Sequence, residues 1–235
     1  LVVTGVQTCA LPISTNKKWV FLKMETDEGI HGWGEVGSSV NVSENFMATA
    51  IREVSPQLIG ENPMDIDRLW NKLFRMFSYM GSRGFTTSLT AGFDIALWDI
   101  KGKLSGLPVY DLLGGRYRDP VRLYCNAWFN GCYTPEEYAN AAKINVLENG
   151  HTACKLDPFL EMTQYHTMYQ DGFISEEGEQ LGYDIVAAVR DTVGPEIEIL
   201  IDAHGHYNVP NAVRISNNLY ERSEEHTSEL QSQPD

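Results

Sequence analysis

The sequence predicts an α/β protein built in two parts, and three observations lead to this prediction. The chain has 235 residues, which is enough for one large or two modest domains with a core of their own. Its first half shows a strand–turn–strand pattern followed only by helices. Its second half repeats strand and helix with short connections, which is typical of parallel right-handed β-α-β crossovers. We therefore expect an α+β domain over residues 15–118 and an α/β domain over residues 119–221.

The first domain is expected to begin with a β-hairpin. Residues 19–26 alternate in polarity, Asp27-Glu28-Gly29 is a turn signal, and residues 30–36 form the returning strand. A helix over residues 43–54 ends before Pro56, because proline disfavours a helical conformation in the residue that precedes it. Two more helices, with apolar residues at the helical spacing of a core-packing face, are expected at residues 62–77 and 86–104.

The second domain is expected to repeat a strand followed by a helix. Short apolar runs predict strands that are buried on both faces. An irregular segment over residues 159–173, rich in Met and Tyr, separates the second strand from its helix. The strands are expected at residues 121–125, 151–156 and 197–201, and the helices at residues 134–149, 175–193 and 210–220.

Composition and charge exclude several classes of function. The formal net charge is −14, which argues against the basic face that nucleic-acid binding requires. No apolar run approaches the ~20 residues of a transmembrane helix, so we expect no membrane partner. The four cysteines are too few for a disulfide framework and lack the close-spaced pairs of a zinc site. A reduced, cytoplasmic setting is therefore expected. The negative net charge does not by itself identify a partner.

The two ends of the chain are interpreted as foreign to the protein. Residues 3–13 and 222–232 can be encoded by the complementary strands of one oligonucleotide, and both resemble translations of a sequencing-library adapter. A signal peptide is the alternative at the amino end, but no positively charged segment precedes its short apolar run. An acidic solvated tail is the alternative at the carboxyl end. We therefore expect residues 1–14 and 222–235 to be adapter artefacts, leave them out of the fold prediction, and expect the protein to be a fragment.

Charged side chains follow the second and third strands of the second domain. Lys155 and Asp157 end the second strand, and Asp202 and His204 end the third. Because adjacent parallel strands bring their carboxyl ends together, where such sheets bind ligands, we expect these side chains to face one pocket. Asp202 offers the hard oxygen that Mg²⁺ prefers, and His204 can act as an acid or a base. Lys155 could neutralise a substrate carboxylate.

Each of these residues also has a purely structural explanation. An aspartate at a strand end often caps loop amides, a lysine beside a loop is usually solvated, and loop histidines are common on surfaces. Taken singly, each residue favours the structural explanation, whereas the joint placement favours a site. Two further polar residues are expected to contact the substrate, Asn126 and His206.

The long helix that ends the first domain carries the most informative motif. It contains Ala91-Gly92-Phe93-Asp94-Ile95-Ala96-Leu97-Trp98-Asp99-Ile100-Lys101-Gly102-Lys103, and Gly106-Leu107-Pro108 and Gly114-Gly115 follow it. This stretch closely resembles the last helix of the capping domain in the enolase superfamily, mandelate racemase/muconate lactonizing enzyme branch. Gly32-Trp33-Gly34-Glu35 resembles the early hairpin of that family. The resemblance covers nearly all of residues 19–221.

The resemblance implies both a fold and a chemistry. The fold is an N-terminal α+β capping domain, here without its first strand, followed by the first three βα units of a truncated (β/α) TIM-type barrel. Family members bind Mg²⁺ and abstract the proton α to a carboxylate, with the metal stabilising the enediolate. Such a C–H group is too weakly acidic unless charge on the carboxylate oxygens is neutralised. Lys155 and Asp202 fall where the second and third barrel strands of the family end.

The second and third strands also indicate which branch of the chemistry to expect. Racemase-type members carry Lys-x-Lys on the second strand, whereas this chain has Lys155-Leu156-Asp157 and lacks that base. Asp202-Ala203-His204 is similar to acid-sugar dehydratases of the galactonate, gluconate or mannonate type. The resemblance then implies a Mg²⁺-dependent hydro-lyase that gives a 2-keto-3-deoxy acid. Asp202 would bind the metal, His204 would act on the leaving hydroxyl as a catalytic residue, and Lys155 would contact the substrate in catalysis.

Other interpretations stay open. A racemase, epimerase or cycloisomerase of the same superfamily would keep the fold and change the reaction. A non-catalytic sugar-acid-binding protein would need the chain to end naturally near Asp235. Asp157, with Asn126 and His206, is expected to bind a small sugar acid whose identity the sequence does not give. The parent enzyme is expected to be a homo-oligomer, and the fragment to be inactive because one carboxylate makes a poor Mg²⁺ site.

Overall fold

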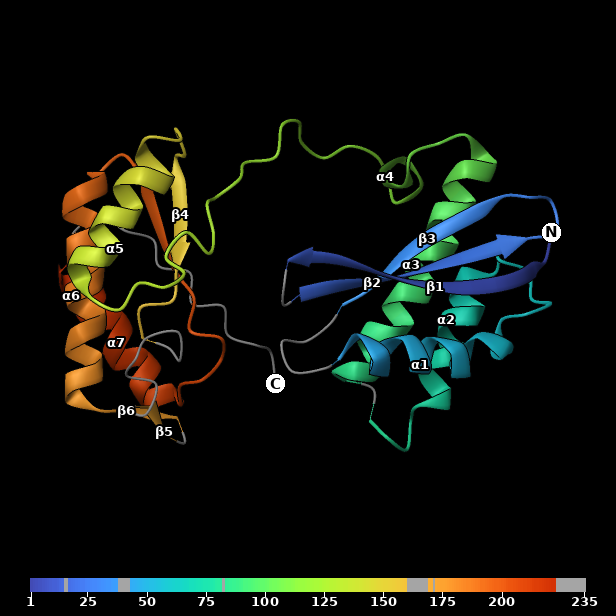
Figure 1. Cartoon of the computed structure of the whole chain (residues 1–235), viewed down its shortest axis with the longest axis horizontal. Helices are drawn as coiled ribbons and strands as arrows, with labels where there is room; N and C mark the ends of the chain where they lie inside the picture. Colours follow the sequence, from blue (N-terminus) through green and yellow to red (C-terminus); the bar gives the residue numbers. More distant parts are fainter. Residues whose placement is uncertain (15–16, 38–42, 82, 160–168, 171, 223–235) are drawn as a thin grey trace. The chain divides into compact units, whose positions relative to one another are not determined.

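The chain divides into two compact units, Leu1–Asp119 and Pro120–Asp235, each with its own core of buried apolar side chains (Figure 1). The computed structural model describes residues 1–14, 17–37, 43–81, 83–159, 169–170 and 172–222. Within these ranges, no helix has the length and apolar character that crossing a membrane requires.

The first unit contains a three-stranded antiparallel sheet in the order β1-β2-β3. Its strands are β1 (Val3–Ser14), β2 (Lys17–Thr26) and β3 (His31–Val36). The register places Leu22 of β2 between Thr8 of β1 and Gly34 of β3. Alternate residues of β2, among them Leu22 and Met24, are fully buried, as the period of a strand with one face on a core requires. The predicted hairpin is therefore confirmed.

Residues 1–14, which were left out of the fold prediction, supply strand β1 of this sheet. Val3 is buried, its N–H donates to the carbonyl of Glu61 (2.9 Å), and its carbonyl accepts from Gly60 (2.8 Å). An antiparallel edge accepts any extended segment whose backbone groups and alternating side chains match, whatever the origin of that segment. The sheet thus has a strand at the position that the sequence analysis left empty. The adapter origin of residues 1–14 stays a prediction, and residues 223–235 lie outside the described part of the chain.

Helices pack on the sheet of the first unit through a shared apolar core. Helix α1 begins where predicted, because Ser43 accepts a hydrogen bond from the N–H of Phe46 as its N-cap. Helix α3 ends at Gly106, which adopts the left-handed conformation that favours glycine after a helix. The helical segments are α1 (Glu44–Val54), η1 (Ser55–Gln57), α2 (Ile66–Met76), α3 (Phe85–Ser105) and α4 (Val109–Leu112).

Helix α3 lies directly against strand β3, and glycines make this approach possible. A Cβ atom on Gly34 would lie 1.8 Å from the carbonyl oxygen of Gly92, and one on Gly32 would lie 2.0 Å from that of Ala96. Two side chains of α3 also bind the free edge of β3. Asp99 accepts a hydrogen bond from the N–H of Trp33 (2.8 Å), and Lys103 donates to the carbonyl of His31 (2.8 Å). The two motifs behind the family resemblance are thus one packing arrangement, which says little about the substrate.

The second unit has a parallel pair of strands, β4 (Ala153–Leu156) and β7 (Glu198–Ile201), with Leu156 opposite Ile201. Its helices are amphipathic and bury one face in the second core. Helix α5 begins with a capping box formed by Thr134 and Glu137. The remaining elements are α5 (Pro135–Ala142), the π-helical segment η2 (Lys143–Leu147), the short strands β5 (Tyr169–Gln170) and β6 (Phe173–Ile174), α6 (Glu176–Val193) and α7 (Val209–Arg222).

The strand expected at residues 121–125 is reduced to a single bridge, so that expectation is wrong in extent. Cys125 pairs with Cys154 in parallel, with its N–H on the carbonyl of Ala153 and its carbonyl on the N–H of Lys155. The residues before it do not join the sheet, and Val121 and Leu123 are 68% and 75% exposed. Apolar side chains favour a strand only when they can pack against a core, and among the described residues no core covers Val121 and Leu123.

Candidate active site at the ends of β4 and β7

The parallel register of β4 and β7 determines where the predicted site residues lie. Leu156 and Ile201 end the two strands side by side, and the N–H of Asp202 donates to the carbonyl of Leu156 (3.0 Å). Asp157 and Asp202 therefore leave neighbouring strands at the same edge, where parallel sheets bind ligands. The backbone of Lys155 is fixed by Trp128, whose indole N–H donates a hydrogen bond to the Lys155 carbonyl (2.9 Å). The sequence analysis did not identify this contribution of Trp128.

Four of the predicted residues meet in one cluster. The ammonium group of Lys155 lies 2.7 Å from Asp202 Oδ2. The Nε2 atom of His204 lies 3.2 Å from Asp157 Oδ2 and 3.8 Å from Asp202 Oδ2. The backbone N–H of His204 also donates to Asp202 Oδ1 (2.9 Å). Both carboxylates are buried, whereas the His204 side chain is 50% exposed, so the imidazole is the most exposed part of the cluster.

The electrostatics of the cluster follow from burial and pairing. Burial alone would raise the pKa of Asp202, but hydrogen bonds from Lys155 and from the His204 backbone bring it below its usual value. Burial likewise opposes the charge of Lys155, yet the contact with Asp202 leaves the pKa of Lys155 raised. Burial dominates at Asp157 and raises its pKa, although His204 and Lys155 act against this. Lys155 and Asp202 therefore form a charged pair, and Asp157 is the carboxylate of the cluster whose charged form burial disfavours.

The cluster can be tested as a site for a divalent cation. One atom each of Asp157, Asp202 and His204 lie within 4.8 Å of one another. Carboxylate oxygens suit Mg²⁺, whereas imidazole nitrogen is a less typical ligand for it. Asp202 already binds a cation, the Lys155 ammonium, through Oδ2. The two carboxylates supply hard oxygens that suit Mg²⁺, but a Mg²⁺ ion at Asp202 would have to displace the Lys155 ammonium from Oδ2 and would need further oxygen ligands.

The two remaining predicted residues lie differently. Asn126 is exposed, and its Oδ1 accepts a hydrogen bond from the next residue, Ala127 (2.8 Å). His206 follows His204 in the same loop, and the centroids of the two rings are 6.3 Å apart. Tyr207 was not predicted as part of this region. Its hydroxyl donates to the carbonyl of Phe159 (3.1 Å) and so links the loop after β7 to the loop after β4. Substrate contacts of Asn126 and His206 stay predictions.

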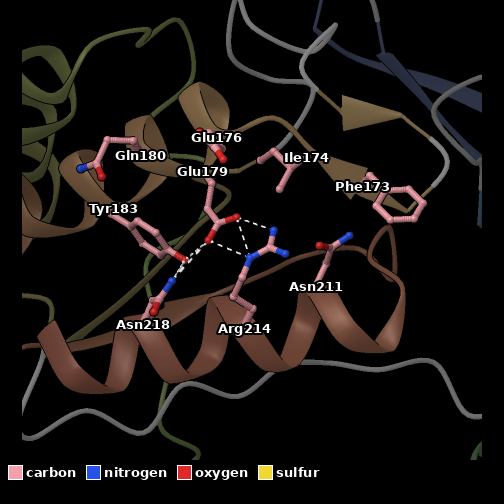
Figure 2. Close-up of a pocket in the computed structure, with 9 residues that line it drawn as sticks. All are labelled: Phe173, Ile174, Glu176, Glu179, Gln180, Tyr183, Asn211, Arg214 and Asn218. Atoms are coloured by element: carbon pink, nitrogen blue, oxygen red, sulfur yellow. Dashed lines mark hydrogen bonds and ion pairs between the residues drawn. The ribbon is translucent and has the colours of Figure 1, made fainter.

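A second polar concavity lies between helices α6 and α7. Figure 2 shows the buried carboxylate of Glu179 on α6 facing Arg214 and Asn218 on α7. Arg214 Nη2 lies 2.6 Å from Glu179 Oε2, and the Tyr183 hydroxyl donates to Glu179 Oε1 (2.5 Å). Burial would raise the pKa of Glu179, but these partners bring it below its usual value. The concavity has a volume of about 540 Å³. Four of its side chains, Glu179, Tyr183, Arg214 and Asn218, pair with one another and join the two helices.

Sequence comparison places the chain among characterised relatives. Residues 3–114 match the family described as mandelate racemase/muconate lactonizing enzyme, N-terminal domain, and residues 137–228 match the family described as enolase C-terminal domain-like. The chain is 37% identical over 211 residues to the D-galactonate dehydratase of Pectobacterium atrosepticum, covering 89% of this chain and 50% of the relative. It is 34% identical over 210 residues to the D-gluconate dehydratase of Thermoproteus tenax, covering 86% and 39%. The chain thus spans about half the length of the curated relatives it matches.

Solved structures give the same relationship. A mandelate racemase/muconate lactonizing enzyme-like protein from Rubrobacter xylanophilus matches with a TM-score of 0.81 and 31% identity, covering 100% of this chain and 61% of that chain. A member of the enolase superfamily from Salmonella Typhimurium matches with a TM-score of 0.82 and 30% identity, covering 94% and 59%. The predicted fold class, an N-terminal capping domain followed by part of a barrel, is therefore confirmed.

Proposed function

The chain belongs to the enolase superfamily, in its mandelate racemase/muconate lactonizing enzyme branch, and we propose that it contributes to a Mg²⁺-dependent sugar-acid dehydratase. The observation that carries the proposal is the pair Asp202 and His204 at the end of β7. Lys155 contacts Asp202, and Asp157 contacts His204. Relatives named D-galactonate and D-gluconate dehydratase support the substrate class.

The proposed reaction removes water from a 2,3-dihydroxy acid. The α-proton leaves to a base, the C–O bond at the β-carbon breaks, and the leaving hydroxyl takes a proton to become water. The resulting enol tautomerises to the 2-keto-3-deoxy acid. The base is expected in the half of the relatives that this chain does not span. A Mg²⁺ ion held at Asp202 would stabilise negative charge that develops on the substrate carboxylate.

Three residues of this chain would have the remaining roles in the reaction. His204 presents a half-exposed imidazole that can give a proton to the leaving hydroxyl. Lys155 carries a positive charge beside Asp202 and would bind the substrate carboxylate. Asp157 stands where racemases of the family carry a second lysine and contacts His204 instead, which favours dehydration over racemisation.

The test is an assay of the full-length product of the source gene, after sequencing of the source DNA across the codons for Glu221 and Arg222. We expect one of D-galactonate, D-gluconate and D-mannonate to give a 2-keto-3-deoxy acid only when Mg²⁺ is present.

His204→Asn should abolish this product and leave Mg²⁺ binding intact, whereas His151→Asn, just before β4, should leave turnover unchanged. Full turnover in His204→Asn would rule out the role, and an epimerised product would identify the rival reaction. The 235-residue chain alone is expected to be inactive.

A further inference from the structure

The carboxylate of Asp157 is too buried for a residue that contacts substrate. Its side chain is 8% exposed, and Oδ2 is engaged with Nε2 of His204 at 3.2 Å. Its other oxygen, Oδ1, is buried and has no hydrogen-bond partner among the described residues. Neither oxygen is therefore presented to a molecule that enters from solvent. The imidazole that it binds is 50% exposed.

His204 adopts a conformation that needs external support. Its φ angle is +48°, in the left-handed region that residues other than glycine, asparagine and aspartate rarely occupy. Two carboxylates from neighbouring strands hold it there. Asp202 Oδ1 accepts the backbone N–H (2.9 Å), and Asp157 Oδ2 binds the ring. A non-glycine residue in this region persists only when its surroundings fix it, and such residues cluster at functional sites.

We propose that Asp157 is the positioning residue of His204: its Oδ2 accepts the Nε2–H of the imidazole and leaves Nδ1 as the ring nitrogen that faces the substrate. In the proposed dehydration the acid would be the imidazolium, which gives the proton on Nδ1 to the leaving hydroxyl and keeps the Nε2–H on Asp157. This inference rests on the proposed dehydration for its consequence in catalysis, but the hydrogen bond itself does not depend on that reaction. A carboxylate that holds one nitrogen of an imidazole determines the tautomer and the direction in which the other nitrogen points. The role replaces the substrate contact expected for Asp157 from the sequence.

The hydrogen bond can be tested in the 235-residue chain without catalysis. Chain labelled with ¹⁵N-histidine is examined by long-range ¹H–¹⁵N NMR, and the His204 signals are assigned by their loss in His204→Gln. We expect an Nε2–H proton that is protected from solvent exchange. Asp157→Leu should abolish the protection, and Glu198→Gln, a carboxylate change at the other end of β7, should leave it unchanged.

Asp157→Asn provides a second variant of the same size, which decides the matter if Asp157→Leu does not fold. A neutral amide oxygen accepts a weaker hydrogen bond than a carboxylate, so the Nε2–H signal should move upfield and exchange faster. A His204 Nε2–H signal that is unchanged in both variants would overturn the proposal. So would a folded wild-type chain in which His204 carries a proton on Nδ1 and none on Nε2.

Kinetics of the full-length protein separate positioning from substrate contact. Asp157→Asn should lower kcat by ~10²-fold with little change in KM, because a displaced imidazole harms the chemical step more than binding. A raised KM with unchanged kcat would overturn the proposal and return Asp157 to substrate contact. If no sugar acid is dehydrated, the proposed function fails, while the NMR result still decides whether Asp157 holds His204.

Discussion

Two buried carboxylates of this chain, Asp202 and Glu179, lie where burial alone would oppose their charge, and each has a cationic partner. Asp202 is buried, yet Lys155 and the His204 backbone keep its pKa low. Glu179 is buried, yet Arg214 does the same for it. A paired buried carboxylate costs far less than an unpaired one. Pairing therefore explains why acidic residues of so acidic a chain can occupy its interior.

Glu61 in the first unit gives a prediction about acid stability. Hydrogen bonds from Arg68 and Lys72 lower the pKa of Glu61 to about 2. Because the folded pKa is below the unfolded one, the stabilisation is complete above pH ~4.5 and is lost as the pH falls towards about 2. Glu61→Gln should flatten this acid limb in urea unfolding followed by circular dichroism. The effect should shrink at high salt, since the pair is near solvent.

Glu53→Gln, an exposed glutamate change on α1, is the matched control and should keep the acid limb of the wild type. An acid limb that is the same in Glu61→Gln and in wild type would show that the Glu61 cluster does not contribute to the pH dependence.

Strand β3 and helix α3 of the first unit are joined by close backbone contact in addition to the apolar core that they share. Gly32 and Gly34 of β3 touch the backbone of α3 at Ala96 and Gly92. Asp99 and Lys103 of α3 then bind the exposed edge of the same strand, which protects an edge that would otherwise pair with another chain. The sheet and the long helix therefore depend on each other, and the motif residues serve this packing.

Gly34→Ala should destabilise the first unit by ~1–3 kcal/mol, because its Cβ would overlap the carbonyl of Gly92 and force the helix away. Gly5→Ala in strand β1 is the control, since a Cβ there would meet only Glu25 Oε2 at 3.5 Å. Urea unfolding of the two variants measures the difference. Equal stability of Gly34→Ala and Gly5→Ala would contradict the close approach.

The whole chain consists of two units with separate cores, and the segment between them is exposed. Tyr117 is 90% exposed, and Val121 and Leu123 are also largely exposed. Proteases cleave exposed segments that can leave the fold locally. Limited trypsin digestion should therefore cut first after Arg116, Arg118 or Arg122, and mass spectrometry should find fragments close to the two units. A first cut inside α3 would contradict this division.

Much of the fold could be predicted from the sequence, because local patterns carry it. Capping residues such as Ser43 and Thr134 and the turn Asp27-Glu28-Gly29 act on their own neighbours, so their elements occur where expected. The strand-end positions of Lys155, Asp157, Asp202 and His204 were also accessible, because parallel strands align their carboxyl ends. The sequence alone therefore determined the order of elements, the family and the cluster of candidate residues.

Only the tertiary structure decided which partner each residue has. The reduction of residues 121–125 to one bridge, the entry of residues 3–14 into the sheet and the Glu179–Arg214 contact all depend on segments distant in the chain. The same holds for Asp157, whose Oδ2 lies 3.2 Å from Nε2 of His204. Local periodicity reports which face of an element is apolar, whereas pairing between distant side chains depends on three-dimensional packing.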